Sequence, residues 1–420
     1  MEKQTPFIPL YLPLTQRSLR VAVVTETYPP EINGVALTIQ HMVDGLRRRN
    51  HQIQLIRPRQ GKGDTPSFTP NLQQILLPGF AIPRYPNLQL GLPAGSALRQ
   101  LWCESRPDVV HIVTEGPLGW SALNEARKLD IPVTSDFHTN FHSYTQHYGI
   151  GWMRRPIGAY LRHLHNRARL TLVPNQGLRH ELEAQGYRNL VIVGRGVDTD
   201  LFNPARRSME LRRSWGAGED DPVAVYVGRL AAEKNLEAVV DAFDAMRARH
   251  PRVKLVWVGD GPQRALLQAR NPGHIFAGMR TGTDLAAHYA SADVFLFPSL
   301  TETFGNVTLE AMASGLAVVA YNYAAAAEHI RHGENGLVAE LDNLSLFCDQ
   351  AAVLAGQPEM VARLGGNARK SADGLSWNQI CECFEQQLLE IVDEGGRHGK
   401  QDRFVPGSDS KLGPGSVSSF

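Results

Sequence analysis

Two charged clusters in the second half of the chain have the residue types needed to hold a diphosphate. The first, Gly228–Asn235, reads GRLAAEKN and places Arg229 and Lys234 five residues apart in a loop that opens a helix. Cations at a helix N-terminus form an anion site, because the free backbone N–H groups and the helix dipole add to their charge. The alternative is a solvated ion pair between Glu233 and Lys234, and this segment alone does not decide between the two.

The second cluster, Glu302–Glu310, reads ETFGNVTLE. Glu302 is expected in a loop and Glu310 in the second turn of the helix that follows, whose free N–H groups near Gly305–Val307 can accept a phosphate. Glu310 is then a natural partner for a ribose diol, and Glu302 for sugar hydroxyls. The alternative is that Glu302 supports the loop and Glu310 is a surface charge, and for an isolated match that alternative is the better one.

Two loops of the first half also lie where strands are expected to end. Tyr28–Val35 reads YPPEINGV, and Gly34 in it permits close approach of the backbone to a ligand. His138 lies in DFHTN, after a short strand expected at residues 132–135. A histidine at the carboxyl end of a strand faces a cleft more often than the core, although most single histidines are structural.

Two further motifs carry less weight. Val258–Pro262 begins like a dinucleotide fingerprint, but Arg264 stands where its third glycine belongs, so the motif is interpreted as a turn and argues against a dehydrogenase. Asp198-Thr199-Asp200 spells the D-x-D of metal-dependent transferases, but it lies in a linker, and Arg229 and Lys234 already supply positive charge. We therefore expect neither a metal nor another cofactor.

The elements that position these loops are short β-branched runs that alternate with helical patterns, which predicts an α/β fold with parallel sheets. The 420 residues are too many for one typical core, so two domains are expected. One series of strands is predicted at residues 21–24, 53–56, 109–113, 170–173 and 191–193, and a second at 223–227, 255–258, 274–277, 294–297 and 316–320.

The predicted architecture is two Rossmann-like domains with a cleft between them, since ligands of open α/β sheets bind outside the carboxyl ends of the strands. The first domain is predicted at residues 18–195 and the second at 204–375, joined by a linker rich in Gly, Asn and Pro at Gly194–Pro204. Residues 376–395 contain an apolar-faced helix that must pack on one of the domains. The polar residues 396–420 are predicted to be disordered.

The composition excludes several classes of protein. Lys plus Arg is 43 against 42 Asp plus Glu, which gives no support for binding nucleic acid. The four cysteines lack the partners of a zinc site and fit reduced thiols. The N-terminus is a poor signal peptide and no run of eighteen apolar residues occurs, so a cytoplasmic protein is predicted. If it meets a membrane, we expect it to bind peripherally to the inner face of the plasma membrane.

One basic segment is suited to such a surface. Trp152–Arg169 combines five arginines with apolar residues, and a basic amphipathic helix can lie on an anionic bilayer. The alternative is an ordinary amphipathic helix that packs on the sheet and leaves its arginines in water. The apolar stretch Phe80–Pro86 is expected to be a loop of the same domain.

The order of the N-G-V loop, H-T-N, G-R-L-x-x-E-K-N and E-x7-E resembles the family 4 retaining glycosyltransferases of GT-B fold. The likeness runs from about Arg20 to Asp393, includes an apparent interdomain crossing at Arg195–Asp198, and is greatest to bacterial lipid-acceptor α-mannosyltransferases and glycolipid synthases. It implies transfer of a hexose from a UDP- or GDP-linked sugar, with retention, to a membrane lipid such as diacylglycerol or a glycolipid. The alternatives are transfer to an oligosaccharide, a polysaccharide or a small metabolite, a nucleotide-sugar epimerase of the same fold, and a non-catalytic binding module.

The resemblance also implies that residues 18–195 form the acceptor-side domain and residues 204–375 the nucleotide-sugar domain. In such an enzyme the loop Phe80–Pro86 is expected to line the path of the acceptor. Roles for individual residues are implied as well. Arg229 and Lys234 would neutralise the departing diphosphate, while Glu302 and His138 would contact the donor sugar. The implied donor-binding set is Gly34, Arg229, Lys234, Glu302, Phe304, Gly305, Asn306, Val307 and Glu310. The sequence departs from the family at Ala324–Ala327, where Gly-Gly often precedes the acid at Glu328; alanine has less backbone freedom, which puts the donor-sugar contacts there in doubt.

Overall fold

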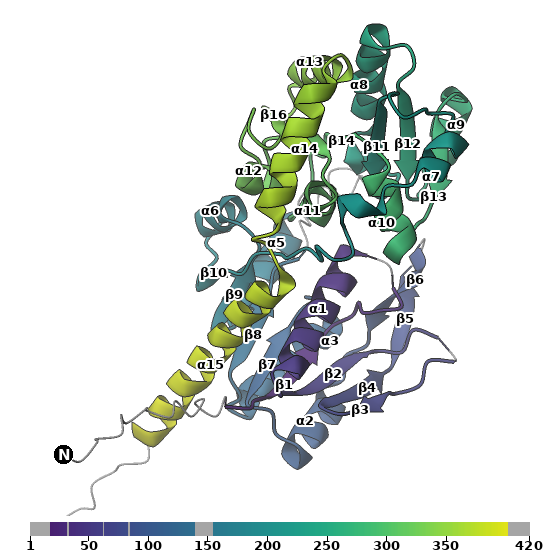
Figure 1. Cartoon of the computed structure of the whole chain (residues 1–420). Helices are drawn as coiled ribbons and strands as arrows, with labels where there is room; N and C mark the ends of the chain where they lie inside the picture. The colour runs from purple at the N-terminus through teal and green to yellow at the C-terminus, as the bar shows by residue number, and fades with distance from the viewer. Residues whose placement is uncertain (1–16, 32, 62, 83–84, 139–153, 402–420) are drawn as a thin grey trace, which may run out of the picture.

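The computed structural model describes residues 17–31, 33–61, 63–82, 85–138 and 154–401. They form two α/β halves stacked end to end, and the chain passes from the first to the second and returns in its last helix (Figure 1). Each half is built around its own sheet.

The first half contains an eight-stranded sheet. Every neighbouring pair is parallel except β3 with β4, which is antiparallel. The apolar runs of the central strands are buried on both faces, as in sheets covered by helices on two sides. In spatial order the strands are β10 (Leu190–Ile192), β9 (Leu170–Val173), β8 (Val133–Asp136), β7 (Val109–Ile112), β1 (Arg20–Val24), β2 (Gln52–Pro58), β4 (Leu72–Leu77) and β3 (Phe68–Thr69).

The helices of this half cover the two faces of its sheet with separate cores. Ile39, Met42 and Leu46 of the first helix pack on one face, and Trp102 and Leu118 belong to the core on the other. The helices are α1 (Gly34–Arg48), α2 (Gly95–Glu104), α3 (Pro117–Lys128), α5 (Arg154–His165) and α6 (Gln176–Ala184).

A separate antiparallel hairpin, β5 (Gly79–Ile82) with β6 (Tyr85–Gly91), stands beside the sheet. It occupies the stretch that was expected to be a loop, and that expectation was wrong. The prolines of this stretch argue against strands in the sequence, but proline is tolerated here because a two-stranded ribbon leaves its outer N–H groups unpaired.

The second half contains a six-stranded, entirely parallel sheet. In spatial order its strands are β13 (Ile275–Gly278), β12 (Lys254–Val258), β11 (Val223–Val227), β14 (Val294–Phe297), β15 (Ala317–Tyr321) and β16 (Leu337–Ala339). Its helices are α7 (Met209–Ser214), α8 (Leu236–Arg249), α9 (Arg264–Arg270), α10 (Gly282–Ala290), α11 (Asn306–Ala313), α12 (Ala324–His329), α13 (Leu344–Ala355) and α14 (Pro358–Ala372), with short 3-10 turns η2 (Pro204–Arg206) and η3 (Ala232–Lys234).

All ten strands of the two predicted series are present, each within two residues of its expected ends. The sequence did not predict β16 or the strands β3 to β6. β3 and β16 are short, β5 and β6 form a two-stranded ribbon, and most residues of β4 are only partly buried, so that none of them needs a buried apolar run.

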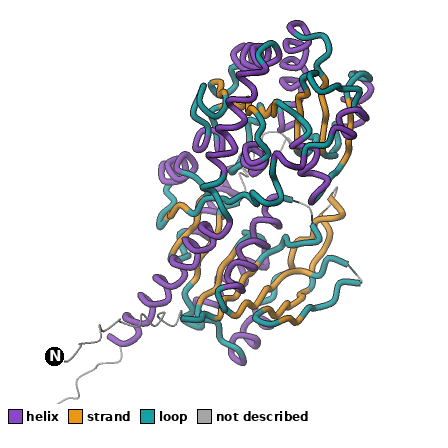
Figure 2. The backbone as a smooth tube through the Cα atoms, in the orientation of Figure 1, coloured by secondary structure: helices purple, strands orange, loops and turns teal. Residues whose placement is uncertain are grey.

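The final helix, α15 (Trp377–Gln401), packs on the first half although it follows the second in the chain (Figure 2). Its Phe384 and Leu388 join the core beneath α1. Glu385 is buried and lies 3.0 Å from Nε of Arg49 and 2.7 Å from Nε2 of His51. The helix continues through residues 396–401, which were predicted to be disordered, because no proline interrupts it and each added residue gains a backbone hydrogen bond; residues 402–420 lie outside the described part.

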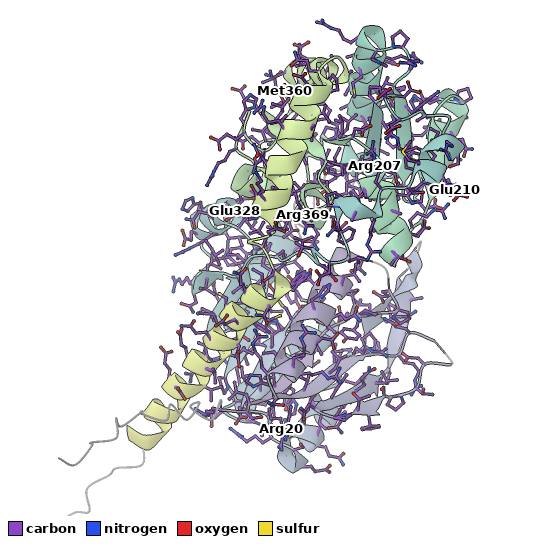
Figure 3. The ribbon with its side chains drawn as sticks, in the orientation of Figure 1. Arg20, Arg207, Glu210, Glu328, Met360 and Arg369 are labelled. Carbon is purple, nitrogen blue, oxygen red and sulfur yellow. The ribbon has the colours of Figure 1, made fainter. Side chains whose placement is uncertain are left out.

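The two passages between the halves are tied to each other and to the second half. Val197 forms a parallel bridge with Ser376. Arg369, labelled in Figure 3, donates to the carbonyls of Thr199, Phe202 and Ala313 at 3.1, 2.8 and 2.8 Å. The crossing is thereby held as a defined structure and does not act as a loose linker.

The D-x-D of this crossing forms a turn. The Asp198 carboxylate accepts from the backbone N–H groups of Asp200 and Leu201 at 3.1 and 2.9 Å. Its oxygens therefore have a structural use within the crossing itself.

Candidate functional site

The loop that carries Arg229 follows β11 and lies on the turn after β12. Gly228 N–H donates to Val258 O at 3.0 Å, and Leu230 N–H donates to Asp260 O at 2.9 Å. A Cβ at Gly259 would come within 2.0 Å of the carbonyl oxygen of Gly228, so only glycine fits. The G-x-G that the sequence indicated as a turn therefore has a further task, which is to support the predicted diphosphate loop.

The cations of this loop meet carboxylates from two places. Arg229 pairs with Glu233, which is buried, and Lys234 pairs with Glu302, 68 residues further along the chain. The sequence alternative of a Glu233–Lys234 pair does not form in this arrangement. Folding thus joins the two clusters that the sequence singled out, and a diphosphate at this point would compete with Glu302 for Lys234.

The helix α11 presents its N-terminus beside this pair. Gly305, its N-cap, has φ 89°, which favours glycine, and provides no side chain to accept from the first turn. Helix N–H groups left in this way are suited to a phosphate. Phe304, immediately before, is buried and fixes the course of the loop.

Glu310 lies in the second turn of α11, as the spacing predicted, and its side chain is partly exposed. Burial around its carboxyl raises the pKa to about 7, although the Tyr289 hydroxyl, which donates to Oε2 at 2.9 Å, lowers it in part. Burial and the neighbouring Glu310 raise the pKa of Tyr289 well above 10, so its hydroxyl stays a donor.

The N-G-V loop of the first half faces the same helix end. Asn33 caps α1 by accepting from Ala36 N–H at 2.8 Å, and this holds Gly34 at the start of the helix. A Cβ at Gly34 would be 3.7 Å from Nδ2 of Asn306, which itself lies 3.4 Å from the Thr38 hydroxyl. The loops predicted to bind the donor from the two halves are therefore in contact.

His138 is held in a buried polar cluster at the carboxyl end of β8. Its Nε2 is 2.8 Å from Oδ2 of Asp136, and its Nδ1 is 3.3 Å from Nη2 of Arg195, which also lies 3.3 Å from Oδ1 of Asp136. A guanidinium can only donate, so Nδ1 of His138 is the acceptor in its contact with Arg195. Burial opposes ionisation of Asp136, but His138 and Arg195 outweigh it and hold the pKa of that carboxyl well below its usual range.

The backbone of the same histidine reaches the second half. The Thr303 hydroxyl donates to the carbonyl of His138 at 2.7 Å, and Asn175 Nδ2 donates to the Thr303 carbonyl at 3.0 Å. Sequence reasoning missed Asp136, Arg195 and Thr303; the one available signal was that Asp136 and His138, two apart, lie on one side of an extended strand. Residues 139 and 140 of the H-T-N motif lie outside the described part.

The alanine stretch that departs from the family pattern supports the donor loop. Ala324 has φ 51°, a left-handed conformation that costs a non-glycine residue roughly 1 kcal/mol. Ala325 N–H donates to the carbonyl of Phe304 at 2.8 Å. Glu328 accepts from the backbone of Gln176 in the first half, and burial raises the pKa of Glu328. The alanines thus keep a conformation for which glycine is better suited.

The described part of the basic segment fits the alternative of an ordinary amphipathic helix, and contact with a membrane stays a prediction. Leu161 and Leu164 of α5 are buried against the first half, while Arg155 and Arg162 are exposed. Residues 152 and 153 lie outside the described part. Within the described ranges, no helix is long and apolar enough to cross a bilayer.

Comparison with known proteins identifies both halves. Residues 32–201 match the model of Glycosyltransferase Family 4, and residues 221–356 that of Glycosyl transferases group 1. The chain is 34% identical over 369 residues to the GDP-mannose-dependent alpha-mannosyltransferase of Mycolicibacterium smegmatis, covering 87% of this chain and 95% of that protein. The chain belongs to glycosyltransferase family 4.

Two other proteins extend the comparison of this family 4 glycosyltransferase. It is 24% identical to the alpha-monoglucosyldiacylglycerol synthase of Acholeplasma laidlawii, covering 90% of this chain and 99% of that protein. It superimposes on sucrose-phosphate synthase from Thermosynechococcus elongatus with a TM-score of 0.76 at 18% identity, over 90% of this chain and 100% of that one. The GT-B fold and the glycosyltransferase activity predicted from the motifs are thereby confirmed, and the epimerase and the binding module are not supported.

Proposed function

We propose that this glycosyltransferase moves a hexose from a nucleotide diphosphate sugar to a membrane lipid with retention of configuration, and that GDP-mannose is the first donor to test. The observation that carries the proposal is the meeting of Lys234 and Glu302 beside the N-terminus of α11, where Asn306 lies 3.4 Å from the Thr38 hydroxyl of the first half. One cluster of loops thus gathers cations, free N–H groups and carboxylates from both halves.

Each group has a task in the proposed reaction. Arg229, Lys234 and the N-terminus of α11 bind the diphosphate, on which negative charge grows as the bond from C1 of the sugar to the phosphate oxygen breaks. Glu310 accepts from the ribose hydroxyls, and Glu302 turns from Lys234 to the sugar hydroxyls. The acceptor hydroxyl bonds to C1 on the face that the diphosphate leaves, and its proton passes to the departing phosphate oxygen.

His138 is proposed to line the donor sugar from the first half. In the ligand-free arrangement both its ring nitrogens are engaged, by Asp136 and by Arg195. Its contact with the sugar is therefore proposed through the ring edge and the backbone next to it, with Asp136 and Arg195 keeping the ring in place.

The donor and the acceptor follow from the relatives. The name of the Mycolicibacterium smegmatis protein gives GDP-mannose as its donor, and the name of the Acholeplasma laidlawii protein gives a diacylglycerol product. A lipid acceptor also suits the exposed arginines of α5, which would lie against the anionic head groups of a bilayer.

A donor and acceptor panel tests the proposal. UDP- and GDP-linked hexoses are offered with a bacterial lipid extract, with soluble glycans and with no acceptor, and released nucleotide and new glycolipid are followed by mass spectrometry. The proposal predicts a new hexosyl lipid, with most turnover from GDP-mannose. Transfer to soluble glycans alone, or a free epimerised sugar without transfer, would refute it.

Sedimentation with vesicles tests the membrane surface. Full-length protein should sediment with vesicles containing anionic lipid and remain in solution with neutral ones. Replacing Arg155 and Arg162 by Glu should abolish sedimentation, whereas the same change at Arg247 and Arg249, exposed on α8 of the second half, should not. Equal sedimentation of the two variants would place membrane contact elsewhere.

A further inference from the structure

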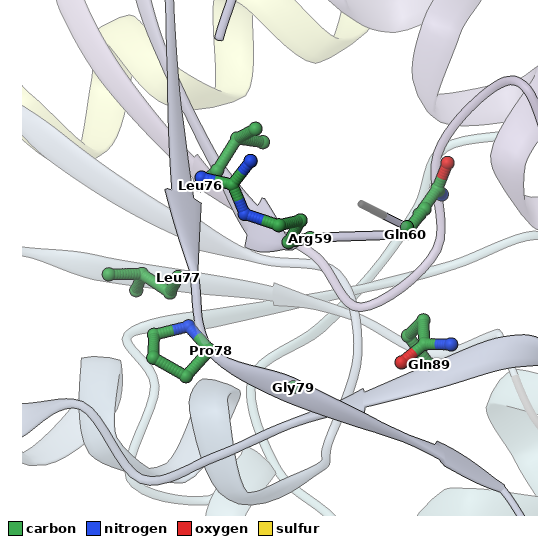
Figure 4. Close-up of a pocket in the computed structure, with 8 residues that line it drawn as sticks. Arg59, Gln60, Leu76, Leu77, Pro78, Gly79 and Gln89 are labelled. Atoms are coloured by element: carbon green, nitrogen blue, oxygen red, sulfur yellow. The ribbon is translucent and has the colours of Figure 1, made fainter. Parts of the chain in front are cut away.

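A cavity of about 480 Å³ lies at the edge of the first half where β2 and β4 end. Its walls come from the ends of these strands and from the β5–β6 hairpin, and include Arg59, Gln60, Leu77, Pro78, Gly79 and Gln89 (Figure 4). The volume lies within the range of small-molecule sites, roughly 300–1,000 Å³. None of the residues assigned above to the donor lines it.

The position of the cavity links it to the reacting centre. The carboxyl ends of parallel strands share one edge, so the ends of β2 and β4 are on the side from which β1 leads into the N-G-V loop. Gln60 Nε2 donates to the carbonyl of Tyr28 at 2.7 Å and to Oε1 of Glu31 at 3.2 Å. A wall of the cavity is thus hydrogen-bonded to the loop that carries Gly34.

The charges around the cavity are unequal. The carboxylate of Asp64 is fully used, since Arg57 holds it through two contacts of 2.6 and 2.9 Å, and Gln60 N–H donates to it at 2.9 Å. Arg59 is exposed and donates to the backbone carbonyl of Asp64, and among the described residues no carboxylate lies within ion-pair distance of it. The lining therefore carries the positive charge of Arg59, which has no ion pair of its own among the described residues, while the nearby Asp64 carboxylate is held by Arg57.

The remaining walls are apolar or neutral. Leu76, Leu77 and Pro78 form one side, and Gln89 brings an amide. Phe80, next to the cavity on β5, is 44% exposed. Apolar faces with few polar groups are typical of sites that orient a small ligand, and the exposed aromatic ring continues the apolar surface beyond the cavity.

We propose that this cavity holds the head group of the acceptor and that Arg59 pairs with an anionic group on it, a carboxylate or a phosphate. The inference rests on the proposed transfer to a lipid, because the residues assigned to the donor do not line this cavity and the acceptor is the other substrate. A guanidinium offers two parallel N–H groups that match both anions. Arg59 would thus set which lipids are accepted and would take no part in the chemical step.

The experiment compares acceptors that differ only in charge. A hexosyl diacylglycerol and the corresponding hexuronosyl diacylglycerol are presented in phosphatidylcholine vesicles, with phosphatidylinositol as the phosphate-bearing probe, and kcat and KM are measured for each. The variants are Arg59→Gln, Arg59→Lys and the matched control Arg106→Gln. Arg106 also donates to a backbone carbonyl, that of Asp130 at 3.1 Å, but it precedes β7 at the opposite edge of the sheet.

For the wild type, at least one anionic lipid should be the better acceptor. Arg59→Gln should raise the KM for that anionic lipid about tenfold or more, the loss expected for one charge-assisted contact. It should leave kcat and the KM for the donor unchanged. The KM for the neutral lipid should stay within about twofold of the wild-type value. Arg59→Lys should recover part of the loss, and Arg106→Gln should change neither acceptor. Whether the carboxylate or the phosphate lipid responds identifies the anion.

Three results would overturn the inference in distinguishable ways. Equal loss with neutral and anionic lipids would make Arg59 a structural residue of the 59–64 turn. A loss matched by weaker sedimentation with the same vesicles would make it a membrane contact. Failure of every lipid to accept a hexose, with nucleotide released to another acceptor, would remove the proposed function as well.

Discussion

Binding of a nucleoside diphosphate to this glycosyltransferase should weaken as the pH falls below about 7, because Glu310 must be ionised to bind the ribose. A ribose diol offers two donors, and an ionised carboxylate accepts from both, whereas a protonated carboxyl has to donate its own proton. Burial raises the pKa of Glu310 to about 7, and among the described residues the Tyr289 hydroxyl, 2.9 Å away, is the one partner that lowers this pKa.

The size of the effect follows from this value. With a pKa of about 7 in the free enzyme, about nine tenths of the Glu310 carboxyls are ionised at pH 8 and about one tenth at pH 6. If only the ionised form binds, Kd is about tenfold higher at pH 6 than at pH 8, which corresponds to roughly 1.4 kcal/mol. The stability effect has the opposite sign: a carboxyl whose folded pKa is raised makes the free protein more stable as the pH falls from 7 towards its unfolded pKa.

Calorimetric titration with GDP and UDP at pH 6, 7 and 8 measures this dependence at constant ionic strength. Glu310→Gln should bind weakly with a flatter profile, and Tyr289→Phe should move the wild-type profile to higher pH, because the donor that lowers the pKa of Glu310 is lost. The terminal phosphate of the ligand titrates equally with every variant, so the difference between profiles isolates Glu310. A Glu310→Gln profile as steep as that of the wild type would refute the assignment of this residue to the ribose.

Three further predictions follow from the charged contacts. Lys234→Ala should lower the initial rate of nucleotide release by about 100-fold or more, the usual loss when stabilisation of a leaving group is removed. Glu302→Ala should lower that rate by about 100-fold as well, because the sugar loses the contact proposed to position it; either variant with more than a tenth of the wild-type rate would remove that residue from the site. Asp136→Asn leaves the buried Arg195 without its counter-charge and should lower the free energy of unfolding in urea at pH 7 by about 3 kcal/mol. This difference should narrow progressively as the pH falls below the usual pKa of 3.8, because Asp136 is then protonated in the unfolded chain but still ionised in the folded protein; an unchanged transition midpoint at pH 7 would contradict this. Glu385→Gln should speed hydrogen exchange in α15 selectively, because the contacts with Arg49 and His51 hold that helix to the first half; uniform exchange across the chain would argue against it.

The fold could be predicted closely because buried parallel strands leave a strong local pattern. Val223–Val227 and Val294–Phe297 match their observed bounds, since a run of apolar residues between turns has few other uses. The β5–β6 hairpin was missed because its prolines outweigh its weak alternation. The sequence could not decide on which half α15 packs, since an apolar stripe such as that at Phe384 and Leu388 can pack on either half.

The residues of the candidate site could be proposed from the sequence, but the contacts among them could not. The types and spacing of Arg229, Lys234, Glu302 and Glu310 predicted a diphosphate site on the loops after β11 and β14. Neither motif decided this alone, but each is local and follows a strand that can be recognised, so that their order along the chain carried the prediction. Which charges pair is a matter of tertiary structure: Lys234 meets Glu302 across 68 residues, and His138 is fixed by Arg195 from the crossing. Such pairs depend on strand order and on how the two halves meet, and both follow from long-range packing that no local pattern in the chain encodes.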